Sequence, residues 1–145
     1  MWEQFFLDFF DSSAKSIGIV VDACGCREGW LQGELYRSGW RRGLETNKYS
    51  LGDYKKADLS CEKAPKMVAE VKIIGADHQG KMRYALDSDV KRLKAIKDPE
   101  LERYLVLVIP KCENASPLGE YLRTCCYSSD CVEREYRRST CGCGS

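Results

Sequence analysis

The sequence predicts an α/β protein in which helices flank a mixed central sheet. Three observations predict this class: aromatic residues recur at helical spacing near the start, residues 67–74 form a strand-like apolar run, and residues 104–109 form another. A predicted helix separates the two runs, so helical and strand periods alternate along one chain. With 145 residues, the chain is long enough for one domain. We expect that domain over 1–127 and a cysteine-rich tail over 128–145.

The first part of the chain is predicted to be mainly helical. Residues 2–11 carry aromatic side chains at i, i+3 and i+4 spacing, which describes one face of a helix. Residues 16–23 are rich in β-branched side chains, and either a short strand or an extension leading into the next helix fits them. Residues 28–40 keep a helical period, and residues 44–55 are expected to form a first strand and a turn.

Helices and strands are predicted to alternate in the later part of the chain. Residues 87–96 have an apolar stripe at helical spacing, and Asp87 or Ser88 can cap this helix. Residues 104–109 are almost continuously apolar, which fits a strand covered on both faces. Residues 117–125 are expected to form a last helix.

Two acids and a lysine are the candidate functional residues. Successive residues of a strand alternate between its faces, so Glu70 and Lys72 point to one face and Val71 points into the core. Asp58 and Glu70 are equally distant from Ala64, so a hairpin turn centred there would place them directly opposite each other. Facing carboxylates repel each other unless a cation compensates them. Either a divalent metal supplies this cation, or Lys72 does so on a merely charged surface.

This arrangement resembles the PD-(D/E)xK phosphodiesterase superfamily, the restriction-endonuclease-like nucleases. Asp58 corresponds to the first acid of the motif, Glu70 to the second acid and Lys72 to the lysine. Glu34, in the preceding predicted helix, is placed for the acid that the family often carries there. The resemblance covers most of the chain, and it departs from the motif at Ala57, where the family has a proline.

The resemblance implies a restriction-endonuclease-like core made of a helix, a three-stranded meander, a second helix and a further strand. It implies hydrolysis of phosphodiester bonds in nucleic acid, with DNA favoured over RNA, and Mg²⁺ or Mn²⁺ as cofactor. Asp58, Glu70, Glu34 and the main-chain carbonyl of Val71 would hold the metal. Lys72 would orient the attacking water or stabilise the pentavalent phosphorane oxyanion.

Basic side chains are the candidates for contact with nucleic acid: Arg37, Arg41, Arg42, Lys91 and Lys94. Trp40 lies between the arginines, and cations with an interleaved aromatic suit a phosphate backbone beside a base or sugar. The arginines equally suit a solvated helix end, where cations favour the dipole. The formal net charge is only +1, so a nucleic-acid surface must come from local clustering.

The assembly and the function class have alternatives. Cutting both strands of a duplex would usually need two copies of so small a domain, and the aromatic face of residues 2–11 is a candidate homodimer contact. A catalytically silent nucleic-acid- or protein-binding module on the same fold is an alternative function. A zinc-stabilised adaptor built on the cysteine-rich tail is another.

Cysteine usage and the first residues of the chain indicate the compartment. The chain has nine cysteines but no CxxC pair, so we expect reduced thiols rather than zinc at the tail. The start carries an acid and lacks the basic region of a secretory signal. No apolar run approaches the roughly 20 residues of a membrane span. We therefore expect a cytoplasmic protein without membrane contact.

Overall fold

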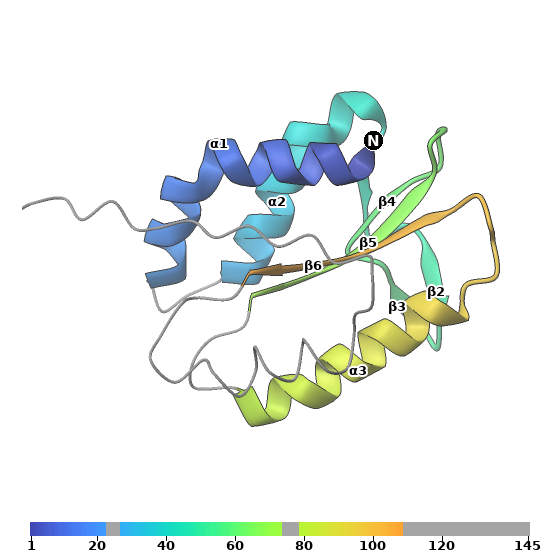
Figure 1. Cartoon of the computed structure of the whole chain (residues 1–145). Helices are drawn as coiled ribbons and strands as arrows, with labels where there is room; N and C mark the ends of the chain where they lie inside the picture. Colours follow the sequence, from blue (N-terminus) through green and yellow to red (C-terminus); the bar gives the residue numbers. More distant parts are fainter. Residues whose placement is uncertain (23–26, 74–78, 109–145) are drawn as a thin grey trace, which may run out of the picture.

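The central sheet has four strands in the order β1-β4-β5-β6, and helices lie on both of its faces (Figure 1). The computed structural model describes residues 1–22, 27–73 and 79–108. The helices are α1 (Trp2–Asp22), α2 (Arg27–Gly39), the 3₁₀ turn η1 (Trp40–Arg42) and α3 (Gln79–Ala95). The strands are β1 (Glu45–Thr46), β2 (Ser50–Gly52), β3 (Lys55–Lys56), β4 (Leu59–Cys61), β5 (Met67–Ile73) and β6 (Glu102–Val108). The predicted mixed α/β class is confirmed.

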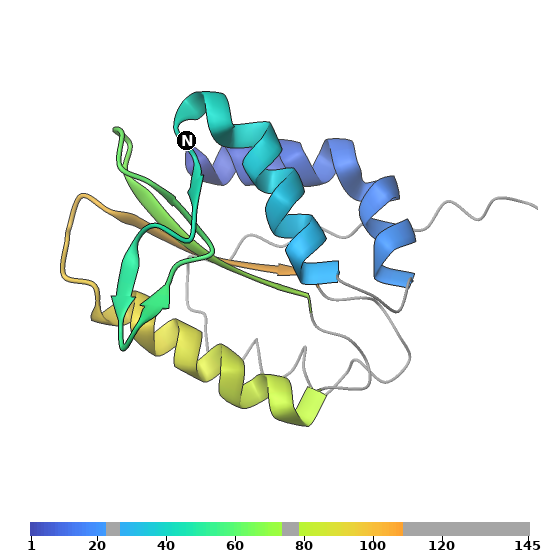
Figure 2. The same ribbon diagram turned by 180° about the vertical axis from the view of Figure 1, so that it is seen from behind.

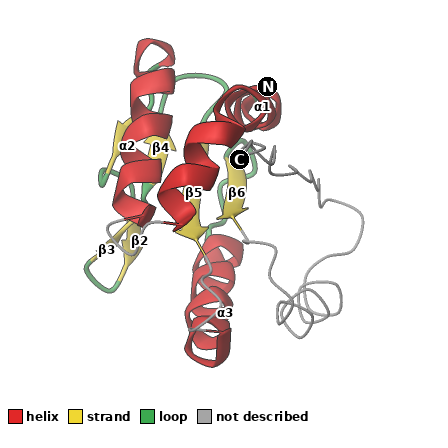
Figure 3. Ribbon diagram, turned by 90° about the vertical axis from the view of Figure 1, so that its left-hand side faces the viewer, coloured by secondary structure: helices red, strands yellow, loops and turns green. Residues whose placement is uncertain are grey.

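Strand β5 is the centre of the sheet, and its alternating side chains separate two cores. Val71 and its odd-numbered neighbours on β5 join the cluster that α1 and α2 cover. Val68 faces the other way and packs with Leu93 of α3. Figures 2 and 3 show the same layers from behind and from the end, with α1 and α2 on one side of the sheet and α3 on the other. Side chains at even positions of β5 therefore face α3.

The pairing of β5 with its neighbours agrees with the predicted register. Strands β4 and β5 are antiparallel, and Leu59 pairs with Ala69, Ser60 with Val68 and Cys61 with Met67. Each of these pairs is symmetric about residue 64, as the sequence predicts. Strand β6 follows α3 and runs parallel to β5 along its whole length. The sheet is therefore mixed, as expected.

The aromatic face of α1 belongs to the protein's own core. Trp2, Phe5, Phe6 and Phe9 are only 4–6% exposed and pack with α2 and the sheet. This face is therefore not free to form the suggested homodimer contact, because the sheet already covers it, and a homodimer stays a prediction. Residues 16–22 continue α1 rather than forming a strand. Tertiary packing, including burial of Ile17, outweighs the weak β preference of their branched side chains.

Three further elements differ from the predictions. The segment expected to be a first strand and a turn contains a separate antiparallel hairpin, β2–β3, beside the main sheet. Helix α3 begins at Gln79, so Asp87 and Ser88 lie inside the helix and do not cap it. Strand β6 is only partly covered on its two faces: Tyr104, Val106 and Val108 pack with the cluster of α1 and α2, Leu105 packs with that of α3, and Val106 alone among residues 102–108 is fully buried. The predicted helix over 117–125 and the tail over 128–145 lie outside the described residues.

Candidate active site

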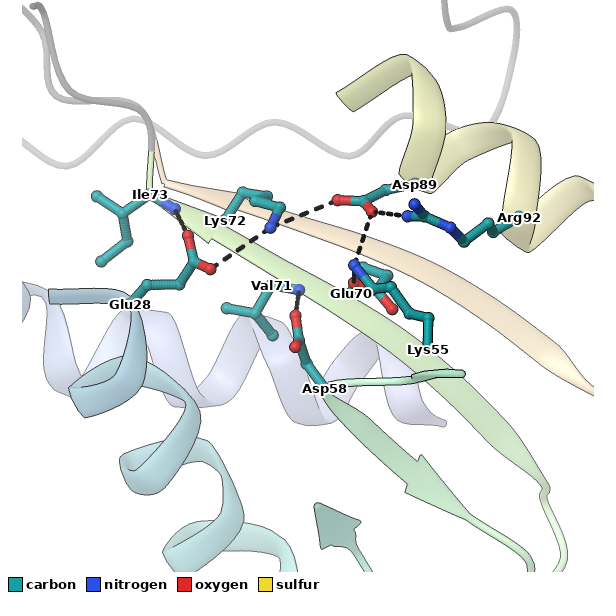
Figure 4. Close-up of polar contacts among 9 residues, drawn as sticks. All are labelled: Glu28, Lys55, Asp58, Glu70, Val71, Lys72, Ile73, Asp89 and Arg92. Carbon is teal, nitrogen blue, oxygen red and sulfur yellow. Dashed lines mark hydrogen bonds and ion pairs between the residues drawn. The ribbon is translucent and has the colours of Figure 1, made fainter. Parts of the chain in front are cut away.

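The site lies on the face of β5 that is turned toward α3. Glu70 and Lys72 both point to this face, whereas Val71 is 0% exposed in the opposite core, as the strand alternation predicts. Asp58 precedes β4 by one residue and lies beside the same part of β5 (Figure 4). The structure thus brings together the two acids and the lysine that the sequence singles out. The antiparallel pairing of β4 with β5 brings Asp58 to Glu70, and the alternation of side chains along β5 puts Glu70 and Lys72 on one face.

Asp58 is fixed against the backbone of β5. Its Oδ2 atom accepts a hydrogen bond of 2.8 Å from the main-chain N–H of Val71. This bond extends the contact between the two chain segments to the residue before the start of β4. It uses one of the two carboxylate oxygens. Asp58 is half-buried, so its carboxylate is held in place without being sealed off from the site.

Glu70 is a fully buried acid that has an ion pair but no hydrogen bond to its carboxylate among the described residues. The residue is 0% exposed, and within the described residues neither Oε1 nor Oε2 has a hydrogen-bond partner. Lys55 Nζ lies 3.3 Å from Oε2 and forms an ion pair with it. Burial raises the pKa of Glu70 to about 7, the charges of Asp58 and Asp89 act in the same direction, and Lys55 opposes them. Ionisation of Glu70 in the folded protein is therefore unfavourable in free energy, and a further cation would make it less so.

Asp89, on α3, is a second buried carboxylate of the site that the sequence reasoning missed. It is 2% exposed, and its Oδ1 atom lies 2.7 Å from Arg92 Nη1 and 3.1 Å from Lys55 Nζ. Its Oδ2 atom lies 3.5 Å from Lys72 Nζ. Three cations thus meet one acid between α3, β3 and β5 (Figure 4).

Lys72 remains a cation in this environment. Its Nζ atom lies 3.5 Å from Glu28 Oε1 and 3.5 Å from Asp89 Oδ2. Burial lowers the pKa of Lys72, but the charges of Asp89, Glu28 and Asp58 outweigh this effect, so the pKa is raised. At neutral pH the side chain is therefore an ammonium group that can stabilise negative charge, not a free amine that could accept a proton.

The acid that α2 contributes is Glu28, not the predicted Glu34. Glu28 reaches Lys72, and its Oε2 atom accepts a hydrogen bond of 3.5 Å from the main-chain N–H of Ile73. Glu34 instead pairs with Arg37 at 2.8 Å on the exposed side of the helix. The two acids are six residues apart, which is a rotation of about 240° around a helix. They therefore lie on different sides of α2, and only the first turn approaches the end of β5.

The predicted nucleic-acid contacts are spread over helices on both faces of the sheet (Figure 3). Arg41 and Arg42 are exposed and lie over the rings of Trp40 and Phe5, at 5.5 and 5.4 Å. They follow the C-terminal end of α2, which is about 17 Å along the helix axis from Glu28. The remaining predicted contacts are exposed on α2 or on α3, which cover opposite faces of the sheet: Arg37, Lys91 and Lys94. The five basic side chains therefore do not form a single patch.

A signal in the sequence could have pointed to Asp89. Leu86 and Leu93 are buried on α3, and Asp89 follows Leu86 by three residues and precedes Leu93 by four. An acid on the apolar stripe of an amphipathic helix is buried, and a buried acid requires partners. Lys55 carries no comparable signal, because its position depends on how the β2–β3 hairpin folds back toward α3.

The donor set fits a hard divalent cation. Glu70 is a buried carboxylate with unused acceptor capacity, and the hydrogen bond from Val71 uses one of the two oxygens of Asp58. In the part of the chain that the structure describes, three or more acidic, histidine or cysteine side chains do not gather into a metal cage. Mg²⁺ usually takes only one or two carboxylates and completes its shell with waters and substrate phosphate, so it does not need such a cage. A role for the Val71 carbonyl stays a prediction.

The other predictions on metals concern residues that are largely outside the described ranges. Of the nine cysteines, Cys61 is described, and it is a free, buried thiol whose Sγ atom lies 3.5 Å from the carbonyl oxygen of Lys63. It packs in the core and does not contact the acids. The cysteines of the tail over 128–145, the candidate zinc ligands, lie outside the described residues.

Comparison with known protein families, curated proteins and solved structures finds no significant match. Among the described helices, none is both long and apolar enough to cross a membrane.

Proposed function

We propose that this protein is a metal-dependent nuclease that hydrolyses phosphodiester bonds, with DNA as the favoured substrate and Mg²⁺ or Mn²⁺ as the cofactor. One observation carries the proposal. Glu70, a fully buried carboxylate without a hydrogen-bond partner among the described residues, shares a strand face with the ammonium group of Lys72, and Asp58 lies beside them. Such a set combines oxygen ligands for a cation with a positive charge for a phosphate.

The order and pairing of the elements support a restriction-endonuclease-like core. Helix α2 precedes the antiparallel meander β1-β4-β5, and α3 connects β5 to the parallel strand β6. This is the succession of helix, meander, helix and strand that the resemblance implies. Glu70 lies on the third strand of that meander, β5, where the family motif has its second acid, and Asp58 lies one residue before the second strand, β4, where the motif has its first acid.

The residues of the site would divide the chemistry among them. Asp58 and Glu70 would hold the cation, which when bound supplies positive charge at the scissile phosphate and makes water easier to deprotonate. Lys72, held by Glu28 and Asp89, would stabilise the charge that develops on the phosphate oxygens. Its raised pKa makes it an electrostatic group rather than the general base.

The direct test is a cleavage assay with the purified full-length chain. We expect cleavage of plasmid or single-stranded DNA in Mg²⁺ or Mn²⁺, slower cleavage of RNA, and no cleavage in EDTA. The reason is that the buried acids need a cation before they can engage an anionic substrate. Electrophoresis of products over time measures the rate. Equal cleavage with and without chelator would show that a contaminating or metal-independent activity is responsible.

Glu28→Gln and Glu34→Gln form a matched pair of variants on α2. The first should lower the cleavage rate by about tenfold to a hundredfold, because it loosens the position of Lys72. The second removes only an exposed pair with Arg37 and should leave the rate within about twofold. Initial rates at saturating Mg²⁺ measure both. The opposite ranking would restore Glu34 as the helix acid and remove Glu28 from the site.

A catalytically silent binding module is the second candidate function. The observation that favours it is the internal neutralisation of the buried acids by Lys55, Lys72 and Arg92. In such a module these contacts would be structural and no metal would be required. DNA binding without cleavage, unchanged by Mg²⁺ or EDTA, would support this reading.

A further inference from the structure

Lys55 occupies the space between the two buried acids of the site. Its Nζ atom lies 3.3 Å from Glu70 Oε2 and 3.1 Å from Asp89 Oδ1, so a single ammonium group bridges a carboxylate of β5 and a carboxylate of α3. Figure 4 shows the side chain reaching in from the hairpin with Glu70 and Asp89 on either side of its end. The two acids are 0% and 2% exposed, so bulk water does not solvate their charges.

One ammonium group only partly satisfies this pair of acids. Neither oxygen of Glu70 is hydrogen-bonded within the described residues, although Lys55 is close, and Asp89 Oδ2 also lacks a hydrogen bond. Unpaired acceptors in a buried site cost free energy. A divalent cation carries twice the charge of the lysine and accepts several oxygen ligands. Repulsion between the ammonium and such a cation would prevent both from occupying the same position.

The hairpin that carries Lys55 allows the side chain to leave without unfolding. Asp53 and Tyr54 both have positive φ, 48° and 61°, and form the tight two-residue turn that precedes Lys55. The base of the hairpin is held in place, because Tyr49 and Leu51 pack against the core beside α3. The Lys55 side chain is 31% exposed, so it has a route to solvent by rotation about its own bonds.

We propose that Lys55 is a resident counter-cation, and that Glu70 and Asp89 bind a divalent cation in its place when Lys55 turns out to solvent. This inference rests on the proposed cation binding at Glu70, and it goes further in two respects. It makes Asp89, beside Glu70, a carboxylate that contacts the cation at the position of the Lys55 ammonium group. It also makes Lys55 a competitor whose removal strengthens metal binding instead of weakening it.

Lys55→Met and Lys56→Met provide a matched test, because both remove one positive charge from β3, whereas Lys56 is exposed and makes no ion pair described in the structure. Titration calorimetry with Mn²⁺ should show that Lys55→Met binds about tenfold more tightly than the wild type. Lys56→Met should stay within about twofold of the wild type. Adding Asp89→Asn to Lys55→Met should reverse the gain. Equal affinities for the two methionine variants would overturn the proposal.

A second measurement uses the wild-type protein and does not depend on the folding of any variant. Amine-reactive labelling followed by mass spectrometry should show faster modification of Lys55 when Mn²⁺ is present, with Lys56 unchanged as the internal reference. Slower or unchanged labelling of Lys55 would contradict its displacement. Both readouts report binding, so a protein that behaves as expected here but cuts no nucleic acid would refute the proposed nuclease and leave this inference standing.

Discussion

Glu70→Gln is expected to make the metal-free protein more stable above neutral pH and to abolish its cleavage activity. The glutamine amide has nearly the shape of the carboxyl group but carries no charge. In the wild type, burial and the charges of Asp58 and Asp89 raise the pKa of Glu70 from 4.5 to about 7. A shift of this size corresponds to about 3 kcal/mol of unfavourable free energy for the ionised form in the folded protein.

The sign of the pH dependence follows from this shift. The folded pKa lies above the unfolded one, so the folded state holds the proton more strongly. The stability that Glu70 contributes is complete below about pH 4.5 and is lost as the pH rises through about 7. In EDTA, the wild type should therefore lose stability over this range, and Glu70→Gln should lose less of it.

Chemical denaturation in EDTA at pH 5 and at pH 8 measures the effect, with Glu34→Gln as the control for a half-buried acid of α2 that lies outside the site. Mn²⁺ at about a hundred times its dissociation constant should then stabilise the wild type at pH 8 by about 2.7 kcal/mol. Glu70→Gln should gain little, because its amide is a poorer ligand. A variant that is no more stable than the wild type at pH 8 would show that ionised Glu70 does not destabilise the folded protein.

The loss of cleavage in Glu70→Gln should be about a thousandfold, because a ligand for the cation is removed from the reacting centre. Stability and activity would thus change in opposite directions. This combination identifies a functional acid, because replacing an acid that only stabilises the fold would lower the stability of the protein. A variant that gains stability and keeps its activity would exclude Glu70 from catalysis.

The sequence predicts the strand part of the site well, for a physical reason. Alternation on β5 places Glu70 with Lys72, and the register with β4 follows from the distance of each residue to the turn at Ala64. Both rules are local, because they need only a strand and a turn. The predicted position of Asp58 beside β5 follows from the same rules.

The helical and hairpin contributions to the site could not be predicted in the same way. Choosing Glu28 instead of Glu34 depends on which turn of α2 approaches the end of β5, and this depends on packing between α1, α2 and the sheet. Asp89 meets Lys55 over 34 positions of sequence, through a hairpin whose placement no local pattern fixes. The aromatic stripe of α1 does not by itself distinguish a core face from an interface, and the presence of a covering sheet decides for the core.

Lys72→Met is expected to lower cleavage by about a hundredfold to a thousandfold while leaving the fold intact. The charge of the ammonium group is removed, but a side chain of similar length remains to fill the space. Asp89 keeps Arg92 and Lys55 as partners, at 2.7 and 3.1 Å, so no buried acid is left without a cation. Circular dichroism and a melting curve check the fold, and single-turnover rates in Mg²⁺ measure the chemistry.

The pH dependence of the rate separates two roles for Lys72. A general base must lose its proton, so its rate would rise as the lysine deprotonates. The carboxylates of Asp89, Glu28 and Asp58 raise the pKa of Lys72 despite its burial, so the ammonium persists through neutral pH. We therefore expect no rise in rate from this group between about pH 7 and 9. Lys72→Arg, which keeps the charge but changes its shape, should retain more activity than Lys72→Met. Parental activity in Lys72→Met would remove this residue from the mechanism.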